Sequence, residues 1–336
     1  MKFRIYLETD LNRVFTKSLG AIAAAELDVI LTHRLETPET KISQVDEGRT
    51  SYLDFDFDGE RAPLVEQLGR LSATAAAFAV HSTSSLEPLP LREQLAFGTE
   101  VVTAQRYKGK TSERLTRLML NVASAADASK AADDRSVLDP MCGRGTTLNW
   151  ALLYGARATG LDVDRRALDD YATFLEQWAK SNRYPHKMQR YKKQNSECRH
   201  FDFTVAVDRA GLSGKAVPDI RTLHAPADSG AMAVGRHAMI VSDLPYGIQH
   251  QARSDGNRTP TSIGDLVENV AALWPSQIRT GGSVALSWNT KTLRASDMTA
   301  LLGRAGFDAV ATRGFEHQVD RTISRDVFLA NRSNRI

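Results

Sequence analysis

The stretch IVSDLPYGIQH (240–250) places four unlike side chains at the point where an apolar run ends. Asp243 carries a carboxylate, Pro245 a rigid ring, Tyr246 an aromatic ring and Gly247 a hinge. Proline and glycine often interrupt regular structure, so a strand followed by an ordinary turn is one interpretation. A carboxylate and an aromatic ring at the end of a buried strand can also do chemistry, and the other motifs of the chain decide between the two.

A second motif, SVLDPMCGRGTTLNWAL (136–152), predicts a strand, a glycine loop and a helix that begins near Thr146. Glycines let backbone amides approach a ligand closely, and a helix N-terminus favours negative charge. No GK[ST] follows, so the loop is not a phosphate loop, and the third glycine of GxGxxG is replaced by Leu148. The loop suits a ligand that has both a cationic amine and a carboxylate. The candidate cofactor residues here are Asp139, Pro140, Cys142, Gly143, Gly145 and Thr146.

Two further acids follow the next two predicted strands. Asp162 lies about twenty residues beyond the glycines, where an acid can accept both hydroxyls of a ribose. Asp164 is the alternative, although it suits the N-cap of the following helix better. Asp228 is placed to accept the amino group of an adenine. Three acids after three consecutive strands, beside a glycine loop, predict S-adenosylmethionine bound to a Rossmann-like fold.

The C-terminal two thirds of the chain alternate between predicted strands and helices, which is typical of an α/β domain with a mostly parallel sheet. Seven strands are expected, of which the last two form an antiparallel pair at one edge. They are residues 136–140, 156–163, 219–225, 237–244, 282–288, 308–315 and 325–331. The expected helices are 146–153, 165–180, 263–277 and 295–305.

The N-terminal residues predict a smaller α+β unit of the ferredoxin-like kind, with the order β-α-β-β-α-β. Its expected elements are 2–9, 10–27, 28–35, 52–57, 62–71 and 75–81. The chain then divides into this unit (1–82), a linker (83–112) and a Rossmann-like domain (113–336), and the last contains a long basic insertion (181–218).

Three polar stretches carry clustered cations that can meet the phosphates of a nucleic acid. They are the entry to the helix near residue 113, the insertion and the segment 249–262. A run of cations is also the usual composition of a solvated face, and for the first two stretches we weigh both interpretations equally. The candidate substrate-binding residues are Lys108, Lys110, Arg190, Lys192, Lys193, Arg253 and Arg258.

The motifs DPMCGRGT (139–146) and DLPYG (243–247) resemble those of class I amino-methyltransferases, and more closely the THUMP-associated guanine-N2 tRNA methyltransferases. The resemblance runs from about Leu115 to Arg332 and includes the closing RTISRDVFLANR (321–332). That family also has an N-terminal ferredoxin-like domain, followed by a THUMP domain. Here only about thirty residues occupy the THUMP position, so the THUMP module is absent or severely reduced.

The resemblance implies a role for each residue of the first motif. Asp243 and the Leu244 carbonyl accept the two hydrogens of an exocyclic amino group, and Pro245 holds these acceptors in place. Tyr246 stacks on a base taken out of its helix or loop. The methyl group passes in line from sulfonium to nitrogen, without a metal. The implied substrate is RNA, and guanine N2 in tRNA is the expected target.

The whole chain limits the remaining alternatives. It has 336 residues, a net charge of +3 and two cysteines, without a run apolar enough for a membrane span or a signal peptide, so a cytoplasmic protein is expected. Other substrates remain open: adenine N6 in DNA, a small molecule or a protein. A non-catalytic RNA-binding protein on the same fold is a further alternative, and an activating protein partner is left open.

Overall fold

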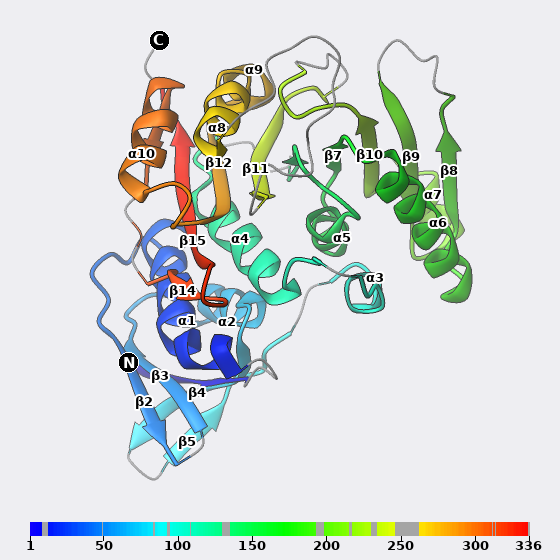
Figure 1. The fold of residues 1–336 in the computed structure, drawn as a ribbon. Helices are drawn as coiled ribbons and strands as arrows, with labels where there is room; N and C mark the ends of the chain where they lie inside the picture. The colour runs from blue at the N-terminus through cyan, green and yellow to red at the C-terminus, as the bar shows by residue number, and fades with distance from the viewer. Residues whose placement is uncertain are drawn as a thin grey trace.

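The computed structural model describes residues 1–8, 13–48, 50–82, 85–92, 95–107, 109–129, 135–192, 198–214, 217–229, 234–245, 262–310, 312 and 314–334. These residues form two sheets with helices packed on them (Figure 1). A five-stranded sheet contains the N-terminal strands, and a ten-stranded mixed sheet contains the rest. None of the described helices combines the length and the apolar character that crossing a membrane requires.

The N-terminal sheet is antiparallel and has the order β2-β3-β1-β4-β5. Its elements are β1 (Lys2–Leu7), α1 (Arg13–His33), β2 (Ile42–Glu47), β3 (Thr50–Asp56), α2 (Arg61–Arg70), β4 (Thr74–Ser82) and β5 (Ser85–Pro88). The order of the first six elements is the predicted one, but the strand predicted at 28–35 is wrong. Those residues continue α1 as far as His33. Leu27, Ile30 and Leu31 recur at helical spacing and are buried, so packing overrides the strand preference of the β-branched Val29 and Ile30.

The N-terminal unit is fastened to the C-terminal domain by α4 (Glu113–Ala126), and α3 (Glu100–Thr103) precedes it in the predicted linker. The Arg117 guanidinium donates to the carbonyls of Arg70 at 3.0 Å and Gly69 at 3.1 Å. The Asn121 amide donates to the buried Glu26 carboxylate at 2.7 Å. One apolar core runs through both units, from Phe3 to helix α5. The two units are therefore packed together as one body (Figure 1).

The large sheet has the order β13-β15-β12-β11-β6-β7-β10-β9-β8, and β14 pairs with β15. Five strands are parallel: β6 (Val137–Asp139), β7 (Ala158–Asp162), β10 (Asp219–His224), β11 (His237–Asp243) and β12 (Ile278–Asn289). The antiparallel strands at one edge are β13 (Phe307–Ala309), β14 (His317–Gln318) and β15 (Ser324–Arg332). The helices are α5 (Thr146–Leu153), α6 (Arg165–Ser181), α8 (Ile263–Ala271), α9 (Trp274–Gln277) and α10 (Ala295–Arg304).

All seven strands predicted for this domain occur, and the last two pair antiparallel at one edge as expected. From β6 the strand order runs through β7 and β10 on one side and through β11 and β12 on the other. The sheet is therefore doubly wound, and ligands of such sheets bind where the order reverses, at the carboxyl ends of the strands.

The basic insertion contributes the three elements β8 (His186–Arg190), β9 (Arg199–Val205) and α7 (Arg209–Leu212). The strands β8 and β9 form a hairpin that extends the sheet beyond β10. Phe201, Phe203 and Val205 alternate along β9 and are buried, which explains why the hairpin adds to the sheet. The insertion is thus part of the sheet for much of its length.

Candidate functional site

The three acids of the predicted site end three parallel strands. Asp139 is the last residue of β6, Asp162 of β7 and Asp243 of β11. Strand β6 pairs with both β7 and β11, so the three carboxylates share one edge of the sheet. This edge includes the reversal of strand order, where a doubly wound sheet binds its ligand.

The glycine loop between β6 and α5 depends on glycine at two positions. Gly143 has φ +52° and Gly145 has φ +79°, values that side chains rarely allow. A Cβ on Gly145 would lie 2.2 Å from Cζ of Tyr171, so the loop also needs its glycine for space. Cys142 is buried, and its backbone N–H donates to the Leu161 carbonyl at 2.9 Å. Cys142 therefore packs the loop against β7.

Asp139 is a buried acid held by uncharged donors. The Ser242 hydroxyl donates to Oδ1 at 2.8 Å and the Met141 N–H donates to the same oxygen at 3.1 Å. Burial raises the pKa of Asp139 to about 6, while hydrogen bonds from Ser242 and Thr147 oppose that rise. A ligand cation at this carboxylate would restore its charged form.

Asp162 closes the loop from the neighbouring strand. Its Oδ2 accepts the Gly143 N–H at 2.7 Å, and its Oδ1 accepts the Asp164 N–H at 2.8 Å. Each carboxylate oxygen has a second lone pair for a ligand hydroxyl. Burial raises the pKa of Asp162. Asp164 caps α6 through the N–H groups of Arg166 and Ala167, as predicted for its alternative role. Asp228 is half-buried in the turn after β10.

Asp243 is held differently, by a hydroxyl and a cation. The Thr111 hydroxyl donates to Oδ2 at 2.8 Å, and Nη2 of the buried Arg325 lies 3.5 Å from the same oxygen. Burial raises the pKa of Asp243, and the positive charge of Arg325 opposes that rise. The Leu244 N–H donates to the Ser287 carbonyl at 2.8 Å, which ties the residue after Asp243 to β12. Pro245 is half-buried.

Thr111 and Arg325 were not among the predicted site residues. Thr111 directly precedes Ser112, the N-cap of α4, whose hydroxyl accepts the Leu115 N–H at 3.4 Å. Arg325 belongs to the closing segment 321–332 and lies on β15, two strands away from β11. Thr111 comes from the segment before α4 and Arg325 from β15, so only tertiary packing brings these two side chains to Asp243.

The segment before α4 contacts both halves of the site. The Tyr107 hydroxyl lies 3.3 Å from the Thr146 hydroxyl at the start of α5, and the Arg144 guanidinium lies 5.0 Å from the centroid of the Tyr107 ring. Four residues further on, Thr111 donates to Asp243. This part of the predicted linker is therefore a wall of the site.

Lys110 has a different role from the phosphate contact that the sequence predicts. Its ammonium donates to the carbonyls of Val102 at 2.6 Å and Gln105 at 2.8 Å, and it pairs with Glu113. These three acceptors match the three N–H groups of an ammonium, which leaves none for a phosphate. Lys110 instead holds the segment before α4 in place.

The remaining predicted substrate residues lie apart or outside the described residues. Arg190, on the edge strand β8, pairs with Glu176 at 2.7 Å, and Lys192 is exposed just beyond that strand. Neither lies near the three acids along the sheet. The predicted site residues outside the described ranges are Lys108, Lys193, Tyr246, Arg253 and Arg258.

Comparisons with known proteins found no matching family model and no matching curated protein. Solved structures with a similar arrangement include TrmN from Thermus thermophilus, with 17% identity and a TM-score of 0.42 over 88% of this chain and 60% of that one. An rRNA methylase from Streptococcus thermophilus has 11% identity and a TM-score of 0.37 over 68% of this chain and 100% of that one. Magnesium protoporphyrin IX methyltransferase from Synechocystis PCC 6803 with bound SAM has 13% identity and a TM-score of 0.39, over 70% of this chain and 89% of that one. This chain thus spans about three fifths of TrmN, and likenesses this distant assign no activity to it.

Proposed function

We propose that this protein transfers a methyl group from S-adenosylmethionine to an exocyclic amino group of a base in RNA. One contact carries the proposal: the Ser242 hydroxyl donates to Asp139 Oδ1 at 2.8 Å. Asp139 opens the glycine-loop motif, and Ser242 directly precedes Asp243 of the DLPYG motif. The hydrogen bond therefore joins the proposed cofactor site to the proposed amino site.

The residues at the edge of the sheet fit the cofactor by their chemistry. Asp139 is a buried carboxylate suited to the amino group, and the N–H groups in the first turn of α5 can meet the carboxylate of the cofactor. Asp162 has lone pairs for the ribose hydroxyls, and Asp228 lies at the end of the next strand for the adenine. S-adenosylmethionine supplies a methyl group on a sulfonium, which makes that methyl electrophilic.

The DLPYG motif would position the nitrogen that receives the methyl group. An exocyclic amino nitrogen is a poor nucleophile because its lone pair is delocalised into the ring. Asp243 and the Leu244 carbonyl can each accept one of its hydrogens, which favours a more pyramidal nitrogen. After the nitrogen bonds to the methyl carbon it must lose a proton, and Asp243, whose pKa burial raises, is the nearest acceptor in the motif. Positioning supplies most of the remaining rate enhancement.

Guanine N2 in tRNA is the target that we propose, on the basis of the paired motifs DPMCGRGT and DLPYG. The N-terminal unit supports it, because its helices and its antiparallel order β2-β3-β1-β4 are those of a ferredoxin-like domain. We propose that this unit, with no room for a THUMP domain after it, forms part of the surface that receives the RNA.

Transfer of a labelled methyl group tests the proposal. Purified protein is incubated with labelled S-adenosylmethionine and, separately, with unmodified tRNA, rRNA, duplex DNA and protein. The RNA products are then digested to nucleosides. We expect label in N2-methylguanosine from tRNA. Label only in N6-methyladenosine, only in DNA or only in protein would contradict the proposed substrate, and no transfer to any of them would contradict the proposed activity.

A further inference from the structure

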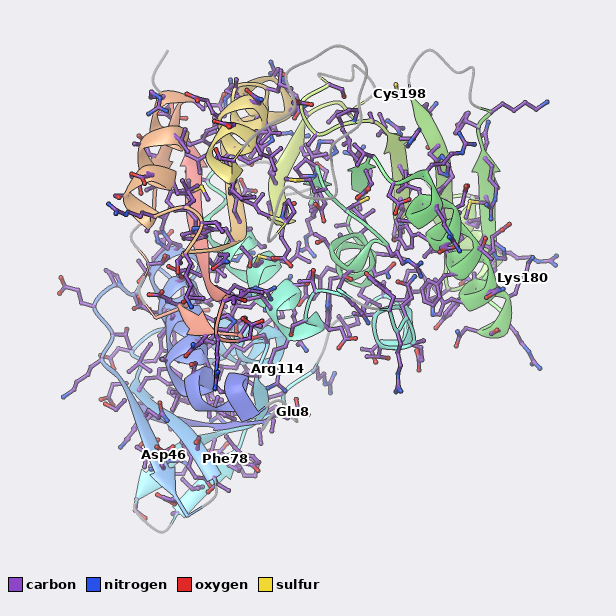
Figure 2. All side chains as sticks on the ribbon, viewed as in Figure 1. Glu8, Asp46, Phe78, Arg114, Lys180 and Cys198 are labelled. Atoms are coloured by element: carbon purple, nitrogen blue, oxygen red, sulfur yellow. The ribbon has the colours of Figure 1, made fainter. Side chains whose placement is uncertain are left out.

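An open hollow of about 600 Å³ lies at the C-terminal end of α6, where β8 and α7 meet it. Its lining residues are Ala179, Lys180, Arg183, Tyr184, Pro185, His186, Arg209, Leu212 and Ser213. Helix α6 begins directly after Asp164, at the edge that holds the site, and its 17 residues span about 25 Å. The hollow is therefore remote from the three acids. Figure 2 shows Lys180 near the end of α6, far from Cys198 at the other end of the β8–β9 hairpin.

One residue that lines the hollow, Tyr184, is held by two neighbouring aromatic rings. The ring of Tyr184 lies 5.1 Å from that of Phe97 and 5.3 Å from that of Trp178, measured between centroids. The Tyr184 N–H donates to the Ala179 carbonyl at 2.9 Å, and the Ala206 N–H donates to the Pro185 carbonyl at 3.0 Å. These contacts fix the backbone on both sides of the hollow, so its shape exists before any ligand binds.

The charges around the hollow are all positive. Lys180, Arg183 and Arg209 are exposed, and no acid is among the lining residues. Within the described part of the chain, no carboxylate forms an ion pair with any of these three cations.

Other arginines of the same sheet edge differ in this respect. Arg190 pairs with Glu176 at 2.7 Å, Arg199 pairs with Asp202 at 2.7 Å, and Arg221 lies 3.7 Å from Asp202. These three arginines on the strands therefore have carboxylate partners, whereas the three cations that line the hollow have none among the described residues.

Arg183 also has a backbone conformation that is unusual for a residue with a side chain. It has φ +58°, just after the C-cap of α6, where glycine or asparagine is usual. A side chain in this left-handed conformation costs stability relative to glycine, and such a cost is often retained at functional positions. The dipole of α6 favours a cation at its C-terminal end, such as Arg183. It does not explain why a further cation, Arg209, reaches the hollow from α7.

We propose that this basic hollow binds the phosphodiester backbone of the RNA substrate, away from the base that is methylated. The proposal rests on the proposed function for the identity of the ligand. Three exposed cations that form no ion pair with a described carboxylate, on a preformed and open surface, suit a chain of phosphates, which is bound through release of its counterions. Because the hollow lies about one helix length from the site, only an RNA long enough to span about 25 Å can use both.

Binding of an unmodified tRNA transcript, measured by fluorescence anisotropy over a series of KCl concentrations, tests this proposal without methyl transfer. The triple variant Lys180→Gln/Arg183→Gln/Arg209→Gln should weaken binding about 10- to 100-fold near 0.1 M salt and reduce the slope of log K against log salt by about 2 to 3. Arg304→Gln is the control, since Arg304 on α10 is exposed but already pairs with Glu268 on α8. We expect it to leave affinity and slope unchanged.

The variants Arg183→Gly and Arg183→Lys separate the effect of the Arg183 charge on RNA binding from its effect on the stability of the fold. Arg183→Gly relieves the left-handed strain, so it should raise Tm and yet lower the affinity for tRNA, whereas Arg183→Lys should keep most of the affinity. Unchanged affinity and slope in the triple variant would overturn the proposal, as would an equal loss in Arg304→Gln. If the triple variant bound tRNA more weakly than wild type and the wild-type protein methylated no RNA, the proposed RNA contact at the hollow would stand. Only the proposed methyl transfer would then be contradicted.

Discussion

The carboxyl ends of β6 and β11 lie side by side, and each ends in a buried acid that is held in a different way. Asp139 accepts hydrogen bonds from a hydroxyl and an amide, and the pKa of its carboxyl is raised to about 6. Asp243 has a cation, Arg325, 3.5 Å away as well as the Thr111 hydroxyl.

This difference indicates what each acid lacks. A buried carboxylate needs a compensating positive charge. No described lysine or arginine forms an ion pair with Asp139, so its carboxylate suits a cationic ligand group, such as the ammonium of the proposed cofactor S-adenosylmethionine. Asp243 already has its cation and suits a neutral partner, such as an amino group. The predictions below test this division, beginning with the largest expected effect.

Asp243→Asn should lower the rate of methyl transfer to tRNA about 10²- to 10⁴-fold, because the variant loses the charge that accepts the amino hydrogen and the released proton. Single-turnover transfer with saturating cofactor measures this. Asp326→Asn is the matched control, since Asp326 is an acid next to Arg325 on β15 that instead accepts the Val327 N–H. A rate for Asp243→Asn within tenfold of wild type would show that the carboxylate does not take part.

Asp139→Asn should stabilise the protein without cofactor at pH 7.5 and leave it nearly unchanged at pH 3.5. The folded-state pKa of Asp139, about 6, exceeds the unfolded value of 3.8, so the folded protein binds this proton more tightly. Stability is therefore lost as the pH rises from about 4 to 6, by about 3 kcal/mol, and asparagine avoids that loss while its oxygen still accepts from Ser242. Urea unfolding at the two pH values measures the difference, and a variant less stable than wild type at pH 7.5 would contradict the buried, uncompensated carboxylate.

Arg325→Gln should move the acidic limb of the pH–rate profile to higher pH, because removing this cation raises the pKa of Asp243 further. Thr111, Ser287 and His317 also face Asp243, and burial lowers the pKa of His317, so it does not replace the lost charge near neutral pH. We expect a loss of about tenfold at pH 7 that shrinks toward pH 9. Arg325→Lys should recover most of the shift. An identical profile in Arg325→Gln would show that the ion pair does not tune Asp243.

Thr111→Val should have the smallest effect, a decrease in rate of about 2- to 10-fold, because it removes one neutral hydroxyl donor while keeping the shape of the side chain. Thr111→Ser restores the hydroxyl and should restore the rate. The Kd for cofactor should not change in either variant. If Thr111→Val weakened cofactor binding and left the rate intact, Thr111 would belong to the cofactor site instead.

The sequence was enough to predict the acids of the candidate site that lie at the ends of strands. Asp139, Asp162 and Asp243 each follow an apolar run and precede a proline, a glycine or a helix cap, so local pattern was enough to place them on one edge of the sheet. The same pattern could not reveal Thr111 and Arg325. Their contacts with Asp243 join residues 132 and 82 positions apart in the chain, through the packing of the segment before α4 for Thr111 and through the order of the strands for Arg325.

Two predictions from local composition, a strand at 28–35 and a phosphate contact by Lys110, differ from the structure because of tertiary packing. Residues 28–35 have the β-branched composition of a strand, yet they continue a helix because their apolar side chains face the core at helical spacing. The charge of Lys110 indicated a phosphate contact, but backbone carbonyls at 2.6 and 2.8 Å already hold its ammonium. The sequence shows that a side chain is charged, but it does not show whether groups of the folded protein already bind that charge.

The most direct test of the division between the two acids is the Kd for S-adenosylmethionine, measured by calorimetry for wild type, Asp139→Asn and Asp243→Asn at pH 7.5. We predict at least a tenfold higher Kd for Asp139→Asn, because the ammonium loses its charged partner, and a Kd within about threefold of wild type for Asp243→Asn. A loss of affinity in Asp243→Asn equal to that in Asp139→Asn would make Asp243 a cofactor ligand and would contradict the account.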